Sequence, residues 1–161
     1  MSIYFNGSTE HGVKFSYTQS SGSWSTSSGS YNTFQSVSIT PSSSSSKILI
    51  NCSFCYTAGG SNLFGYMRFK RGSSTIAIGN SDGPRERCLA DLTVQDRPRE
   101  LIQYPVTYQW VDEPSTTSSI TYYLQIKLTN GGTYYFGKTS NGGDGNRSST
   151  VQSFTVREIG V

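Results

Sequence analysis

The residues of this chain that could do chemistry are three cysteines, one histidine and a few carboxylates. Cys52 and Cys55 form a C-x-x-C pair, the spacing of redox motifs and zinc sites. Such sites begin at a turn or a helix, whereas this pair lies within KILINCSFCYT, which alternates like a strand and would point the two thiols to opposite faces. His11 is the only imidazole and Cys88 the only other thiol, so we expect free, packed cysteines with no metal and no cofactor.

The polar residues do not suggest a catalytic group either. A Ser or Cys nucleophile needs a histidine base, and the single His11 stands far from any regular pattern. Asp112 and Glu113 are adjacent at a Pro-containing turn. Two carboxylates that cleave a glycosidic bond must be held apart across the substrate, so this pair is a poor candidate. The NGGDGN loop offers only Asp144 to a hard cation, so a glycine-rich turn is favoured. We predict that the protein is not an enzyme.

The composition limits which elements could position these residues. Charged residues are 14 % and aromatics 13 % of 161 residues, while Ser, Thr, Gly and β-branched residues dominate and Ala is rare. This excludes a helical bundle and an α/β enzyme. The net charge of +3 without a basic cluster argues against nucleic acid. No apolar run approaches the roughly 18 residues of a membrane span, and no signal peptide is visible, so we expect no membrane insertion.

Alternating apolar residues predict strands through most of the chain. Ile48 to Tyr56 and Ile120 to Leu128 alternate most cleanly. Further strands are expected over 33–40, 63–71, 75–78, 88–94, 106–111, 133–138 and 150–159. Turns at 71–74 and at Asn130-Gly131-Gly132 indicate hairpins. Eight to ten such strands predict an all-β protein, a jelly-roll-like antiparallel β-sandwich.

The first 32 residues differ from the rest. Residues 20–30 (SSGSWSTSSGS) are low in complexity and carry one large side chain. We therefore expect a flexible Ser/Gly-rich N-terminal arm over 1–32 and a sandwich domain over 33–161. The arm is either a flexible tail or an anchor that orders on a partner. In the second case its docking residues are Phe15, Tyr17 and Trp24.

Two further groups are candidates for contact with partners. The charged stretch over 80–105 reads as a long loop between sheet elements, which is either a solvated loop or a partner-facing one. Its candidate partner-facing residues are Arg85, Arg87, Arg97 and Arg99. Aromatics on the second face of a strand suggest burial against neighbouring subunits. The candidate subunit-interface residues are Tyr123, Tyr134, Tyr135 and Phe136.

Four segments carry patterns that occur together in one family. They are ITPSSSSSKILI (39–50), MRFKRGSSTIAIG (67–79), WVDEPSTTSSITYYLQ (110–125) and the ending over 148–161. In this order they resemble β-structured virion surface proteins of tailed bacteriophages, notably those of marine bacteria. The resemblance covers residues 33–161 and carries no catalytic residues.

The resemblance implies a place on the virion surface, for a protein made in the host cytoplasm, and it favours a homotrimer. The expected partners are other virion proteins, either the major capsid protein or a tail component. We favour a capsid decoration protein, because the 32 residues before the domain suit a docking arm better than a fibre shaft. The alternatives are the receptor-binding head of a tail fibre that recognises host surface glycans, and a stand-alone carbohydrate-binding module.

Overall fold

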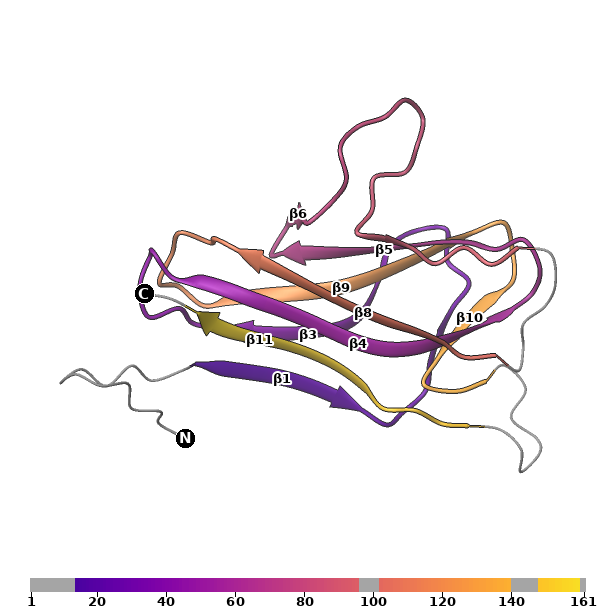
Figure 1. Ribbon diagram of the computed structural model, residues 1–161, viewed down its shortest axis with the longest axis horizontal. Helices are drawn as coiled ribbons and strands as arrows, with labels where there is room; N and C mark the ends of the chain where they lie inside the picture. The colour runs from indigo at the N-terminus through magenta and orange to yellow at the C-terminus, as the bar shows by residue number, and fades with distance from the viewer. Residues whose placement is uncertain (1–13, 96–101, 140–147, 160–161) are drawn as a thin grey trace.

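The computed structural model describes residues 14–95, 102–139 and 148–159, and these form strands joined by turns and loops, without a helix (Figure 1). Within these ranges, no helix that could cross a membrane is present. The strands are β1 (Phe15–Ser20), β2 (Trp24–Thr26), β3 (Asn32–Ile39), β4 (Lys47–Gly59), β5 (Phe64–Arg71), β6 (Ser74–Ile76), β7 (Ala90–Asp91), β8 (Tyr104–Asp112), β9 (Ile120–Thr129), β10 (Thr133–Phe136) and β11 (Gln152–Ile159).

The strands form two antiparallel sheets, which confirms the predicted β-sandwich. Sheet A has the order β1-β11-β4-β10-β2, with β8 paired to the other side of β4. Sheet B has the order β3-β9-β5-β6, with β7 also paired to β5. Most strands run along the long axis of the molecule (Figure 1). The long strand β4 organises sheet A, because it pairs with β8, β10 and β11.

The core between the sheets is built from the alternating residues that the sequence pattern indicates. The inward face of β4 carries Ile48, Ile50, Cys52, Phe54 and Tyr56, and that of β9 carries Ile120, Tyr122, Leu124, Ile126 and Leu128. All ten side chains are buried. Because strand side chains alternate between faces, the local sequence alone identifies these core positions.

One of the two predicted hairpins is present and the other is wrong. The turn after Arg71 joins the paired strands β5 and β6, with Gly72 at positive φ. The turn at Asn130 instead carries the chain from sheet B to sheet A, because β9 and β10 pair with different neighbours. Three consecutive positive φ values, 75°, 67° and 95° at Asn130, Gly131 and Gly132, make this crossing. A Cβ on Gly132 would lie 2.7 Å from the Leu63 side chain, which is why the crossing needs glycine.

Residues 14–32 differ from the expected arm because both of their strands belong to sheet A. β1 pairs with β11 along its whole length, and β2 pairs with β10. Trp24 lies inside this arrangement, with its ring centroid 5.1 Å from Phe34 and 5.2 Å from Phe136. The described part of the arm is therefore an edge of the sandwich. Its Ser/Gly composition conceals this because the partner strands lie far along the chain.

An irregularity in β3 changes which of its residues face inward. The pairing with β9 shifts between Thr33 and Gln35, so a β-bulge lies there. The partly buried Phe34 packs on Phe54 and Phe136, at ring-centroid distances of 5.4 and 4.7 Å, while the adjacent Gln35 is buried. Two consecutive side chains thus enter the interior.

Two buried carboxylates flank Ile48 at one end of the interior, one on each neighbouring strand. Asp112, at the end of β8, accepts hydrogen bonds from Arg71 Nη1 at 3.0 and 3.1 Å and from Tyr122 Oη at 2.7 Å. It thereby ties β8 to sheet B. Burial and the Asp112 carboxylate raise the pKa of Tyr122, which keeps this phenol protonated.

Glu158, the second carboxylate, holds the serine run that joins β3 to β4. It accepts hydrogen bonds from Ser42 N at 2.7 Å, from Ser42 Oγ at 2.9 Å and from Ser46 Oγ. Burial alone would raise the pKa of Glu158, but the hydrogen bonds from Ser46 and Ser42 hold it below its ordinary value. Part of this low-complexity run therefore has a structural role.

The stretch after β6 is the long excursion that the charge pattern predicts, and it projects from the body of the molecule (Figure 1). Only β7 forms in place of the strand expected over 88–94, and residues 96–101 lie outside the described ranges. Glu86 connects the excursion to the outer side of sheet B. Its carboxylate lies 2.8 Å from Lys127 Nζ and accepts a hydrogen bond from Tyr31 Oη at 3.1 Å.

Candidate interaction surface

The residues with catalytic or metal-binding chemistry are not assembled into a site in the described part of the chain. Cys52 is buried in β4 and Cys55 lies half-buried on the opposite face, both as free thiols. Burial raises the pKa of Cys52 to about 12, against a smaller lowering by a backbone hydrogen bond from Tyr108. Among the described residues, no group of three or more His, Cys, Asp or Glu side chains could hold a metal. His11 and Asp144 lie outside the described residues.

The adjacent carboxylates of the β8 turn point to different surroundings. Asp112 is buried on Arg71 and Tyr122, as described above. Glu113 is exposed and forms an ion pair with Lys47 at 2.8 Å. The Lys47 ammonium holds the pKa of Glu113 below its ordinary value. Both groups are therefore engaged in ion pairs, and they do not face a common cavity.

The predicted docking residues are divided by the structure. Phe15 and Tyr17 are 54 % and 59 % exposed and stack on each other at a ring-centroid distance of 5.6 Å. Trp24 is half-buried against the core and is used within the domain. Two of the three residues thus remain available for a partner.

The four predicted interface aromatics are also divided, and two of these assignments are wrong. Tyr134 and Phe136 are fully buried, because β10 crosses into sheet A and turns this face toward the core. The Tyr134 hydroxyl donates to the Leu92 carbonyl at 2.6 Å. Tyr123 and Tyr135, on the outward faces of their strands, are only half-buried.

The described arginines of the excursion make local contacts. Arg85 pairs with Asp82 three residues earlier, and Arg87 Nε donates to the Gly79 carbonyl at 2.9 Å. Both are exposed, which agrees with the interpretation as a solvated loop and leaves contact with a partner untested. Arg97 and Arg99 lie outside the described residues.

The outer face of sheet A carries a row of side chains that was not apparent in the sequence. Strand register places Phe15 opposite Arg157, Arg157 opposite Leu49, and Leu49 opposite Val111. Directly opposed residues of antiparallel strands share a face, so the four side chains form one line across β1, β11, β4 and β8. We call this line, together with Tyr17 stacked on Phe15, the outer row. It joins the two predicted docking residues to the exposed Val111.

The strand at the other end of this row has an unusual edge. In the described chain β8 pairs only with β4, so its second edge has no strand neighbour. Residues 107–111 are all exposed, and Asp112 is the only charged residue of the strand. Edge strands of soluble proteins are usually protected by charges, and this one has only Pro105 near its start. Strand β8 is therefore well suited to contact another protein.

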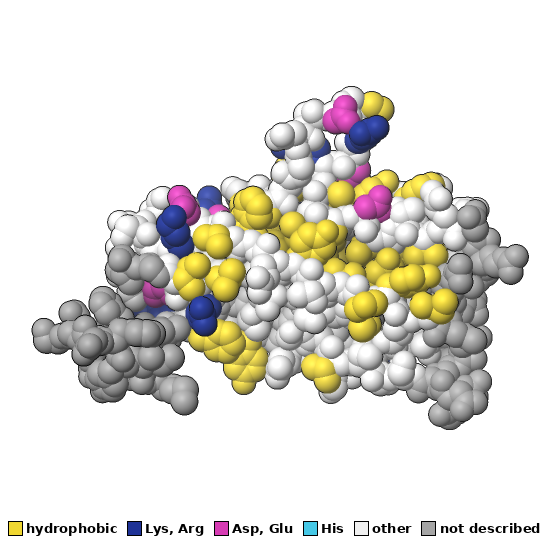
Figure 2. All heavy atoms as spheres, viewed as in Figure 1, with side chains coloured by type: hydrophobic (Ala, Val, Ile, Leu, Met, Phe, Trp, Pro, Cys, Tyr) yellow, Lys and Arg dark blue, Asp and Glu magenta, His cyan; other side chains and the backbone are white. Residues whose placement is uncertain are grey.

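Tyr108 and Trp110 are on the inward face of β8 and yet remain 37 % and 44 % exposed. Each lies opposite a buried residue of β4, Cys52 and Ile50 respectively. These two side chains remain exposed because the edge of sheet B that faces them consists of the short strands β6 and β7, which do not cover them. Figure 2 shows hydrophobic side chains gathered in a band along the molecule. We call the exposed Tyr108 and Trp110, with the unpaired backbone of β8, the β8 edge.

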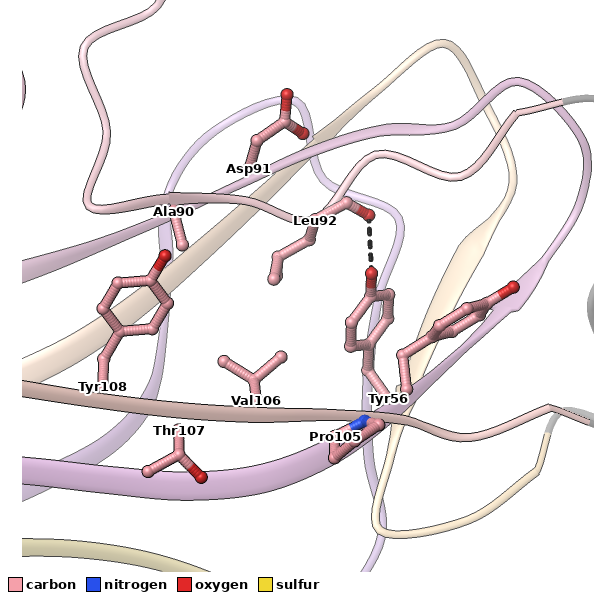
Figure 3. Close-up of a pocket in the computed structure, with 9 residues that line it drawn as sticks. Tyr56, Ala90, Asp91, Leu92, Pro105, Val106, Thr107 and Tyr108 are labelled. Atoms are coloured by element: carbon pink, nitrogen blue, oxygen red, sulfur yellow. Dashed lines mark hydrogen bonds between the residues drawn. The ribbon is translucent and has the colours of Figure 1, made fainter.

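A groove of about 320 Å³ lies between β8 and the segment around β7. Val106 and Tyr108 point from β8 toward Ala90 and Leu92, whereas Thr107 points away (Figure 3). At its inner end, Tyr56 Oη donates to the Leu92 carbonyl at 3.1 Å.

Burial, with smaller contributions from Tyr104 and Asp91, raises the pKa of Tyr56 to about 12. The described lining offers apolar surface, phenol hydroxyl groups and a single carboxylate, Asp91, which suit binding by packing better than acid–base chemistry.

No protein-family model matches the sequence, and no curated protein matches it. Among solved structures, the chain is similar to one described as the structure of infectious bursal disease virus Gx strain, with 10 % identity and a TM-score of 0.48 over 97 % of this chain. It is also similar to the infectious bursal disease virus VP2 subviral particle, with 12 % identity and a TM-score of 0.46 over 98 % of this chain. The matched region spans 45 % and 46 % of these two viral chains, so this chain corresponds to less than half of the length of each. The β-sandwich assignment rests on the strand pairing of this protein itself.

Proposed function

We propose that the protein is a non-enzymatic structural component of a virus particle, a capsid decoration protein that attaches to the head shell through the outer row. The observation that carries this proposal is the outer row itself. Phe15, Tyr17 and Val111 are exposed apolar side chains aligned across one sheet face, a surface typical of protein contacts. The sequence resemblance to phage virion surface proteins supplies the kind of partner. The position of the protein in this proposal is the virion surface.

The test removes the apolar docking groups and leaves the fold intact. The variant F15S/Y17S should reduce occupancy on capsids that lack the protein by about tenfold or more, because about 2 kcal/mol of apolar burial is lost. The matched control is Val151→Ser, which removes an equally exposed apolar group outside the row. Bound protein is measured by quantitative gel analysis of purified particles.

Three results would count against this proposal. Full occupancy of F15S/Y17S would show that the outer row is not the anchor. Loss of host adsorption with normal particle assembly would instead identify the receptor-binding head of a tail fibre. Equal loss in the Val151→Ser control would indicate a general effect of surface polarity. Deletion of residues 1–32 is a poor test, because it removes β1 and β2 from sheet A.

We further propose that the protein assembles as a homotrimer through the β8 edge, with Tyr123 and Tyr135 as additional contacts. Closed cyclic symmetry is the default for such assemblies, and the phage resemblance favours three-fold symmetry. Light scattering at micromolar concentration should give three times the chain mass of 17.6 kDa. Trp110→Lys should lower that mass toward one chain, because a charge on an edge strand opposes pairing. A monomeric unmodified protein would reject the trimer.

A further inference from the structure

A second hollow lies at the opposite side of the sandwich from the β8 edge. The outermost strands there are β1 in sheet A and β3 in sheet B, and Thr18 Oγ1 donates to the Ser36 carbonyl at 2.7 Å between them. Between the β1–β2 turn and β3 lies a cleft of about 510 Å³. This size is in the range of sites for small organic molecules. We call this side the β1–β3 edge and the hollow the polar cleft.

The lining of the polar cleft has a distinct chemistry. None of the described residues that line it is charged. Its amides come from Gln19, Gln35 and Gln152, its apolar surface comes from Trp24 and Phe34, and the other lining residues are Ser, Thr and Gly. Amides and hydroxyls both donate and accept hydrogen bonds, whereas the aromatic pair offers an apolar wall. This combination matches a neutral ligand that has many hydroxyl groups and an apolar C–H face.

Gln35 points most directly to a ligand. Its side chain is 6 % exposed, and neither its amide oxygen nor its amide nitrogen has a hydrogen-bond partner among the described residues. An unpaired buried amide destabilises a fold. Gln35 lies on the inward face of β3 together with Val37 and Ile39, and it is paired with the buried Leu124 of β9. The fold therefore holds a costly polar group at a cleft wall, which is typical of binding sites.

We propose that the polar cleft binds an uncharged saccharide. A sugar hydroxyl would donate to the Gln35 amide oxygen, a second would accept from its amide nitrogen, and the sugar C–H face would pack on the Trp24–Phe34 wall. Acidic sugars are disfavoured, because the described lining offers no cation to pair with a carboxylate. The proposal does not depend on the virion role, since the cleft and the outer row share no residue.

The experiment begins with the unmodified full chain on an array of neutral and acidic oligosaccharides. The neutral oligosaccharide retained best is then titrated by calorimetry into the unmodified protein, Gln35→Leu and the rim variant Gln19→Leu. Gln109→Leu, on the far side of the molecule, is the matched control. We expect Gln35→Leu to weaken binding about tenfold or more, Gln19→Leu to weaken it less, and Gln109→Leu to leave it unchanged.

Thermal unfolding of the free proteins provides a second measurement. Gln35→Leu removes an unpaired buried amide, so its Tm should rise while its affinity falls. A fall in Tm would mean that the amide is satisfied within the fold, which would overturn the proposal. Retention of no neutral oligosaccharide would also overturn it, as would equal retention of acidic ones. Binding that is unaffected by Gln35→Leu would exclude the polar cleft as the site.

Discussion

The β1–β3 edge and the β8 edge, at opposite sides of the sandwich, differ in the contacts that join the two sheets. At the β1–β3 edge, the Thr18 hydroxyl donates to the Ser36 carbonyl between the sheets, and the lining of the polar cleft carries no charge in the described chain. At the β8 edge, an ion pair between the buried Asp112 and the partly buried Arg71 fixes one end of the strand, while Tyr108 and Trp110 remain exposed. The same strand alternation thus yields a polar hollow suited to a small molecule and an aromatic edge suited to a protein.

The largest effect that distinguishes the two sides is expected at Asp112. Asp112→Ala leaves Arg71 and the Tyr122 hydroxyl without their partner, so we expect a loss of about 3 kcal/mol in the free energy of unfolding. The control Asp82→Ala removes an exposed ion pair with Arg85 and should cost less than about 1 kcal/mol. Urea denaturation monitored by tryptophan fluorescence measures both. Equal losses would show that the β8 edge does not depend on this carboxylate.

A smaller loss in the free energy of unfolding, and one that depends on pH, is expected for Glu158 on β11, next to the edge strand β1. Glu158→Gln weakens charge-assisted hydrogen bonds from Ser42 and Ser46 and should cost about 1.5 kcal/mol at pH 7. The pKa of Glu158 is lower in the folded state, so its stabilising contribution is present above the ordinary value of 4.5 and is lost as the pH falls through the folded value.

The difference between the unmodified protein and Glu158→Gln should therefore shrink as the pH falls below about 4.5. Urea denaturation at pH 7 and at several acidic pH values measures this difference. A constant difference at every pH would show that the Glu158 charge makes no contribution to stability.

The smallest expected effect is a change in the rate of cysteine alkylation, which compares how easily the two sides of β4 open. Cys52 lies in the middle of β4, which pairs on one side with β8 and on the other with β11. Its burial and raised pKa should make its alkylation much slower than that of the half-buried Cys55 and Cys88. Mass spectrometry should show a greater acceleration of Cys52 labelling by Asp112→Ala than by Glu158→Gln. The reverse order would mean that the β1–β3 edge opens first.

The sequence predicts the elements whose pattern is local. The faces of β4 and β9 follow from alternation, and of the predicted docking residues Phe15 and Tyr17 are exposed. The assignments that failed depend on distant pairing. Tyr134 and Phe136 face the core because β10 leaves its sequence neighbour for β4.

The residues that sequence reasoning missed also depend on tertiary structure. Trp110 and Tyr108 occupy inward positions, and they are exposed only because sheet B is short beside them. Gln35 shares the inward face of β3 with Val37 and Ile39, so alternation was a usable signal, but a polar glutamine was not recognised as a buried residue. For strand β8 the usable signal was the lack of charge along 104–111, which is unusual for an exposed strand.

The pairing of β1 with β11 also has a consequence for the time that folding takes. In the described chain, the first strand β1 pairs within sheet A only with the last strand β11. Strand β4 also pairs with strands that come later in the chain, β8 and β11. Sheet A therefore cannot be completed on the ribosome until residues 152–159 have emerged. A topology with such distant contacts folds in milliseconds to seconds. Until it pairs with β4, strand β8 has no neighbouring strand in the described chain and carries Asp112 as its single charge, so newly made chains are most prone to aggregate before β4 and β8 have paired.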